Sequence, residues 1–186
     1  MKSKINNFLE YLPFLINQKL SFFLNQIGEI ENLLFNHHKL LIKKPIFICG
    51  LARSGTTAIL NLLNNHKETG SFEYRDLPYT KTLIFWNKIN SLFYRGLKKK
   101  GRIHGDDMEV DQYSPDSLEE IIWGDFLQDY NNSGFFTFLD QDYTNRNFEN
   151  YFYNQIRKIL KVRGNKKRYL SKANYNIFRI KYIKKL

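Results

Sequence analysis

The sequence predicts an α/β fold built around a parallel sheet, and three consecutive features predict it. The run from Pro45 to Cys49 is apolar and rich in strand-forming residues, which is typical of a buried parallel strand. A loop with two glycines, residues 50–55, follows it. Residues 56–65 then have apolar side chains on one helical face. A strand, a tight loop and a helix in this order predict a layered α/β domain.

The region ahead of the strand, residues 5–41, has apolar side chains at helical spacing and predicts helix, with a break or an early turn at Pro13. Such an amphipathic region could bind a membrane surface or a partner helix. Packing against the rest of the protein is the interpretation that we favour. We therefore predict an N-terminal helical segment at 1–44 and a domain at 45–186.

The remaining elements are predicted from apolar spacing and from turn residues. Pro115 suits the first turn of a helix, because acidic residues follow it early. Few strands are visible, and the chain stops inside or just after a helix, so we expect a sheet that is incomplete at its C-terminal end. The predicted elements are strands at 70–72 and 168–171, helices at 79–97, 115–130, 148–162 and 175–186, and a basic loop at 98–105.

The composition is that of a folded protein, with 42% hydrophobic and 25% charged residues among 186. The single cysteine, Cys49, excludes an intramolecular disulfide scaffold. Cys49 lies in an apolar run, so we interpret it as a small buried residue.

The formal net charge of +11 suits an anionic partner, which could be a nucleic acid, an anionic cofactor or an acidic acceptor. No nucleic-acid-binding motif accompanies the basic clusters, so specific nucleic-acid binding is disfavoured. No apolar run reaches the roughly 18 residues of a transmembrane helix. The N-terminus shows no clear signal-peptide cleavage site. We therefore expect a cytoplasmic protein.

The loop from Gly50 to Thr57 has the chemistry of an anion-binding site. Gly50 and Gly55 let the backbone turn tightly and approach a ligand. The first amides of the following helix point outward, and together with the helix dipole they attract phosphate or sulfate oxygens. Arg53 adds a permanent cation with several donors. The hydroxyl donors of the loop are Ser54, Thr56 and Thr57.

A Walker A loop is the first alternative for this segment. That motif needs a lysine after its second glycine, and the lysine reaches the terminal phosphates. Thr56 stands at this position. A P-loop kinase or ATPase is therefore the less favoured interpretation.

The string from Arg53 to Thr57 resembles the 5′-phosphosulfate loop of the sulfotransferase superfamily, whose donor is 3′-phosphoadenosine 5′-phosphosulfate (PAPS). It is most similar to the branch of tyrosylprotein sulfotransferases and bacterial sulfotransferases with an Arg-Ser-Gly-Thr-Thr loop. The likeness continues through His66 to Glu73 and Pro78, although Ala52 stands where the family often has proline. The resemblance implies a P-loop-like three-layer fold and no metal. It also implies that the donor is bound by Arg53, Ser54, Gly55, Thr56 and Thr57.

A second match lies near the C-terminus. Residues 168–172 followed by 175–186 resemble the strand and helix that carry an active-site lysine in that branch, which implies that Lys172 supports the transition state. The family usually has a small or acidic residue and then proline after this lysine, whereas this chain has Ala173 and Asn174. A surface cation at a strand end is the alternative for Lys172.

The general base is assigned by the same resemblance. Glu73 corresponds to the family's active-site glutamate, and a slip of one position would put Tyr74 there instead. His104 is the second candidate, because other branches use histidine. His104 with the acidic residues that follow it could instead bind a metal, but the spacing fits neither an EF-hand nor a zinc signature. A solvated acidic loop is the interpretation we favour there.

The resemblance implies sulfuryl transfer from PAPS to a hydroxyl or amine of a carbohydrate, lipid or other small acceptor, with an insert at about 79–165 shaping the acceptor pocket. No Arg-Asp-Pro-like segment, which grips the 3′-phosphate in the family, is found in the sequence. We therefore expect an N-terminal fragment of such an enzyme. A non-catalytic nucleotide- or anion-binding remnant is the alternative.

Overall fold

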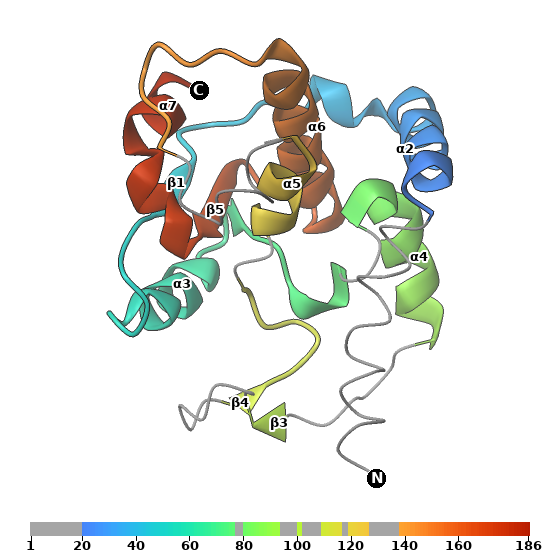
Figure 1. Cartoon of the computed structure of the whole chain (residues 1–186). Coiled ribbons are helices and arrows are strands. Elements are labelled where there is room, and N and C mark those ends of the chain that lie inside the picture. The colour runs from blue at the N-terminus through green and yellow to red at the C-terminus, as the bar shows by residue number, and fades with distance from the viewer. Residues whose placement is uncertain (1–19, 77–79, 94–99, 102–108, 117–118, 127–137) are drawn as a thin grey trace, which may run out of the picture. The chain divides into compact units, whose positions relative to one another are not determined.

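The computed structural model describes residues 20–76, 80–93, 100–101, 109–116, 119–126 and 138–186 (Figure 1). The chain divides into two compact units. One, here called the helical unit, comprises Met1–Lys39 and Tyr74–Tyr113. The other, the sheet unit, comprises Leu40–Glu73 and Ser114–Leu186. Each unit is described by itself.

In the helical unit, a glutamate links two helices. Its described elements are helices α2 (Ser21–Leu34) and α4 (Leu83–Phe93), the 3-10 turns Asn36–Lys39, Tyr74–Asp76 and Thr80–Thr82, and the antiparallel strands β3 (Lys100–Gly101) and β4 (Glu109–Val110). Buried Glu31 of α2 accepts a hydrogen bond of 2.7 Å from the Phe85 amide in the first turn of α4. A carboxylate there satisfies an amide that has no partner within its own helix.

The sheet unit contains three parallel strands, β1 (Ile46–Ile48), β2 (Thr69–Gly70) and β5 (Arg168–Lys172), in the order β1-β5-β2. β5 pairs with β1 from Ile46–Leu170 to Ile48–Lys172, and it also pairs with β2. The predicted α/β class with a parallel sheet is confirmed. The last of these strands along the chain is therefore the central one, and all three end at the same edge.

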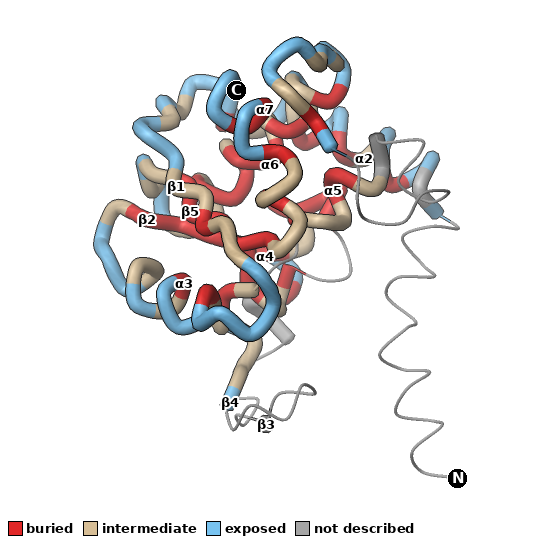
Figure 2. The backbone as a smooth tube through the Cα atoms, turned by 60° about the vertical axis from the view of Figure 1, so that its left-hand side comes forward, coloured by how far each residue is buried: buried red, intermediate tan, exposed pale blue. Residues whose placement is uncertain are grey.

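Helices cover both faces of this sheet. Side chains alternate between the faces along each strand. Ile48 and Leu170 pack with Leu60 of α3 (Thr56–Asn64) on one face. On the other face, Phe47 and Tyr169 contact the ring of Phe152, which belongs to α6 (Arg146–Val162). The unit is thus built of three layers, helix, sheet and helix, and the strands between them are largely buried (Figure 2).

The predicted helices at 56–65 and 148–162 are confirmed, the second with an earlier start. The side chain of Asn145 accepts a hydrogen bond from the Phe148 amide, and Glu149 accepts one from the Asn145 amide. This reciprocal cap fixes the first residue of α6 at Arg146. Periodicity alone placed the start later because the cap consists of polar residues.

The helices predicted at 115–130 and 175–186 differ from the observed elements. Pro115 is not in the first turn of a helix; it forms an isolated bridge with Glu73, and α5 spans Glu119–Phe126. The predicted C-terminal helix is divided into a 3-10 helix, Asn174–Phe178, and α7, Ile180–Lys185. Arg179 stands at the break because its fully buried guanidinium lies over the Trp123 ring and pairs with Glu120 of α5. These tertiary contacts override the local helical pattern.

The shorter elements also depart from the predictions. The strand predicted at 70–72 pairs only at Thr69–Gly70. In the predicted basic loop at 98–105, Lys100–Gly101 forms β3, and the rest lies outside the described residues.

Candidate active site

The carboxyl edge of the sheet carries three of the predicted site segments. β1 ends at Ile48 and leads into the glycine loop, and β5 ends at Lys172, which is the register partner of Ile48. Glu73 lies three residues after the end of β2. Ligands of parallel α/β sheets bind at this edge. The sheet topology therefore gathers these segments on one side of one unit.

Gly50 is required by close packing at the start of the loop. A Cβ atom there would lie 2.7 Å from Cγ2 of Thr56 and 2.9 Å from Oγ of Ser54. The hydroxyl of Ser54 donates a hydrogen bond of 2.6 Å to the carbonyl of Leu51. The loop therefore turns back on itself, and only glycine leaves room for that turn.

Two loop residues adopt the left-handed conformation, Arg53 with φ of 66° and Gly55 with φ of 78°. Glycine does so readily, whereas the left-handed region costs other residues about 1–2 kcal/mol. Strained residues of this kind are concentrated at functional sites. The loop is exposed from Leu51 to Gly55, and α3 begins directly after it without a capping side chain. A helix start of this kind suits the oxygens of a phosphate or sulfate.

Lys172 is buried, with 7% of its surface exposed. A surface cation, the alternative raised by the sequence, would be solvated. Its side chain points to the same face of the sheet as Ile48, the face covered by α3. A cation at this point lies beside the strand that leads into the loop.

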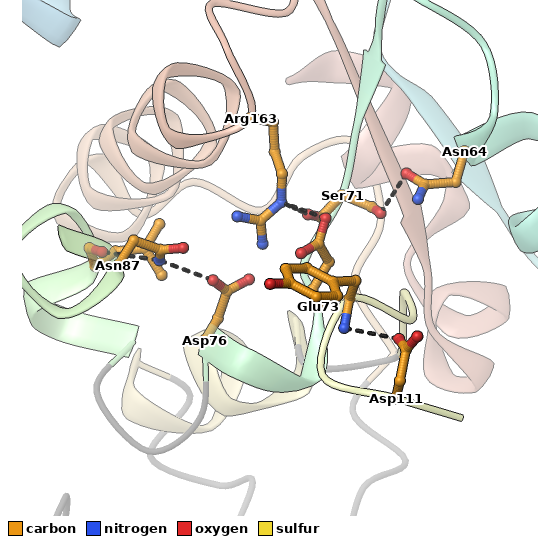
Figure 3. A network of polar contacts seen from close by, with 9 residues as sticks. Asn64, Ser71, Glu73, Asp76, Asn87, Asp111 and Arg163 are labelled. Carbon is orange, nitrogen blue, oxygen red and sulfur yellow. Dashed lines mark hydrogen bonds and ion pairs between the residues drawn. The ribbon is translucent and has the colours of Figure 1, made fainter. Parts of the chain in front are cut away.

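Glu73 is anchored by an ion pair. The Nε of Arg163 lies 2.8 Å from Oε1 of Glu73 and also donates a hydrogen bond of 3.1 Å to the carbonyl of Ser71 (Figure 3). The hydroxyl of Ser71 in turn donates to Oδ1 of Asn64 at the end of α3. The segment after β2 is thus tied to the ends of both flanking helices.

Of the other residues that were singled out from the sequence, the structure describes Tyr74 and His66. Tyr74, the alternative to Glu73, starts the turn Tyr74–Asp76 of the helical unit. His104 lies outside the described residues. His66, at the end of α3, is exposed, and its Nδ1 accepts a hydrogen bond from the Glu68 amide. Within the described part of the chain, no cluster of His, Cys, Asp and Glu side chains is arranged to hold a metal ion.

The comparison with protein families decides the family. A family model described as "Sulfotransferase family" matches residues 45–186, which include the loop, Glu73 and Lys172. The chain belongs to the sulfotransferase family. Membership of that family indicates a transferase that moves sulfuryl groups. No curated protein and no solved structure matches the chain.

One buried carboxyl of this sulfotransferase was not singled out as a site residue from the sequence. Glu119, at the start of α5, is 1% exposed. Its Oε2 accepts a hydrogen bond of 2.7 Å from the hydroxyl of Tyr169, and its Oε1 accepts one of 2.8 Å from Nε1 of Trp123. Burial raises the pKa of this carboxyl, although the hydrogen bonds partly oppose the rise. The sequence shows only an acidic helix start, because Tyr169 comes from a distant strand.

The same carboxyl affects the cysteine next to the loop of the sulfotransferase. Cys49 is half-buried, and its pKa is raised first by burial and second by the charge of Glu119. The thiol is therefore kept in its protonated form, as expected for a packing residue. Within the described residues, no helix combines the length and the apolar character needed to span a membrane.

Proposed function

We propose that the protein is a PAPS-dependent sulfotransferase of the branch with an Arg-Ser-Gly-Thr-Thr loop. Its acceptor is a hydroxyl or amine of a carbohydrate, lipid or other small molecule. The observation that carries the proposal is the register pairing of Ile48 with Lys172, because it sets a buried lysine beside the strand that leads into the loop. Family membership supports the reaction class.

The loop is the proposed donor site. The exposed left-handed segment and the start of α3 can present amides to an anion, and Arg53 adds a delocalised cation that suits phosphate and sulfonate oxygens. The residues proposed to bind the 5′-phosphosulfate are Arg53, Ser54, Gly55, Thr56 and Thr57. The net charge of +11 favours the approach of a multiply charged donor.

The proposed reaction is a displacement at sulfur. The acceptor oxygen or nitrogen forms a bond to the sulfur, and the bond between sulfur and the bridging phosphate oxygen breaks. The sulfuryl group passes to the acceptor, and 3′-phosphoadenosine 5′-phosphate leaves with the electron pair of the broken bond. The acceptor proton passes to a base of the protein.

Three charged side chains have proposed roles in this step. Glu73 is the general base that takes the acceptor proton, with His104 as the second candidate. Lys172, together with Arg53, stabilises the negative charge that builds on the bridging and sulfonate oxygens. A fixed and buried cation such as Lys172 stabilises such charge more strongly than a solvated one does. We further propose that residues 79–165 shape the acceptor pocket.

Calorimetric titration with 3′-phosphoadenosine 5′-phosphate tests the proposal, with ATP and magnesium as the control ligand. We expect the bisphosphate to bind and ATP with magnesium to bind more weakly. Arg53→Ala should weaken bisphosphate binding by about tenfold or more, since a charged hydrogen bond contributes roughly 1.5–3 kcal/mol. Preference for ATP with magnesium would instead support a kinase-like enzyme. A folded chain that binds neither ligand would refute the proposed donor site.

A further inference from the structure

Arg163 is a residue of the sheet unit that forms an ion pair with Glu73. It is the C-terminal capping residue of α6, yet its side chain is only 6% exposed, and that of Glu73 is 9% exposed. Both members of the ion pair are thus removed from bulk water. A buried ion pair is sensitive to the loss of either partner, because the remaining charge is left uncompensated.

A glycine beside this ion pair leaves space for the arginine side chain. A Cβ atom on Gly70 would lie 3.2 Å from Cβ of Arg163 and 3.4 Å from its Cγ. The absence of a side chain at the end of β2 therefore lets the end of α6 pass close over the strand. Gly164, with φ of 86°, turns the chain away directly after Arg163.

The same nitrogen of Arg163 contacts two points of the segment that follows β2. Nε lies 2.8 Å from Oε1 of Glu73 and 3.1 Å from the carbonyl oxygen of Ser71 (Figure 3). One contact fixes the backbone two residues before Glu73, and the other fixes its side chain. Holding both the backbone and the side chain restricts where the carboxylate of Glu73 can lie and how it is oriented.

We propose that Arg163 is a positioning residue for the reaction, which holds Glu73 at the carboxyl edge of the sheet in one orientation. This inference rests on the proposed function, in which Glu73 is the general base. Arg163 acts through Glu73 and does not itself contact the acceptor. Loss of Arg163 should therefore lower the rate of transfer and leave binding of the donor product unchanged.

A double-mutant cycle with the full chain tests this role. The variants are Arg163→Gln, Glu73→Gln and the double variant, with Arg146→Gln as the control, because Arg146 is an exposed arginine on the same helix. The readouts are release of 3′-phosphoadenosine 5′-phosphate from PAPS with a panel of phenol, hexose and alcohol acceptors, and calorimetric affinity for the bisphosphate. Arg163→Lys tests whether a conservative change restores part of the rate.

We expect Arg163→Gln to lower kcat by roughly 10- to 100-fold, as misplacement of a reacting group does. In the Glu73→Gln background the same change should have little further effect, and Arg163→Lys should recover part of the rate. Equal losses in both backgrounds, or a loss of bisphosphate affinity, would overturn the positioning role while the proposed function stands. A wild-type chain that binds no bisphosphate and consumes no PAPS overturns the proposed function, and this inference with it.

Discussion

Ile48 and Lys172 are register partners at the ends of two adjacent parallel strands. Ile48 leads into the glycine loop within two residues, and Lys172 is the last residue of β5. Their pairing fixes the distance between the loop and the lysine through backbone hydrogen bonds rather than through flexible side chains. Groups held on strand ends are positioned more accurately than groups on long loops.

The charge of Lys172 should matter more for turnover than for donor binding. Lys172→Met keeps the length of the side chain but removes its charge, and we expect kcat to fall by about 100-fold, as for other groups that stabilise transition-state charge. Steady-state kinetics together with bisphosphate titration measure the two effects. Lys181→Met, a change at an exposed lysine of α7, is the matched control. Equal rates in the two variants would exclude a role for Lys172 in the transition state.

The left-handed conformation of Arg53 predicts opposite effects on stability and binding. Arg53→Gly should raise the free energy of unfolding by up to about 1 kcal/mol, because glycine adopts φ of 66° without strain. The same change should weaken bisphosphate binding. Asn165→Gly, at φ of 58° in another turn, is the control that should relieve some strain and leave binding unchanged. Urea unfolding and calorimetry measure the two quantities; unchanged binding in Arg53→Gly would contradict the proposed donor site.

Close packing at Gly50 predicts that a second substitution can compensate for the loss of this glycine. Gly50→Ala puts a methyl group 2.7 Å from Cγ2 of Thr56, so we expect it to destabilise the chain by about 1–3 kcal/mol, as overpacking does. Thr56→Ser removes that methyl group and should restore part of the loss in the double variant. Thermal unfolding of the single and double variants measures the coupling. If the losses of stability in the two single variants simply add in the double variant, the contact with Cγ2 of Thr56 is not the cause of the destabilisation.

Burial of Glu119 predicts a pH dependence of stability. Its raised pKa means that the folded chain binds the proton more tightly than the unfolded chain does. The free energy that this preferential protonation adds to the folded state is fully present below the ordinary carboxyl pKa of 4.5. It is lost as the pH rises through the higher pKa of the folded chain. Glu119→Gln keeps hydrogen-bonding groups but cannot ionise, so its free energy of unfolding should fall less over that range.

Urea unfolding at several pH values measures this difference. Glu29→Gln, at an exposed position on α2, is the control and should follow the wild type. If Glu119→Gln and the wild type show the same pH dependence, the carboxyl is not protonated preferentially in the folded chain.

The loop was predictable from the sequence because its signals are local. Glycine at Gly50 and Gly55, the apolar run before them and the apolar spacing after them fall within one short segment. The position of Lys172 at a strand end was also predictable, since a short strand pattern ends there. Local propensity and apolar periodicity carried both predictions.

The contacts that build the rest of the site were not predictable, because they join distant segments. Arg163 and Ser71 are 92 residues apart, and nothing in either local sequence specifies the contact. Glu119 looked like an ordinary acidic helix start because its hydroxyl partner, Tyr169, lies 50 residues further on. Pro115 was assigned to a helix because its local sequence suits one, whereas the observed bridge depends on Glu73.

The central place of β5 has a consequence for the order of folding. Among the described strands, β1 and β2 each pair with β5 and not with each other. Arg168 of β5 also donates a hydrogen bond to the carbonyl of Lys44, 124 residues earlier. Closing so long a loop is slow compared with forming the helices. During synthesis the glycine loop therefore exists before the strand that aligns it. Until β5 inserts, β1 and β2 present open edges to any other extended chain.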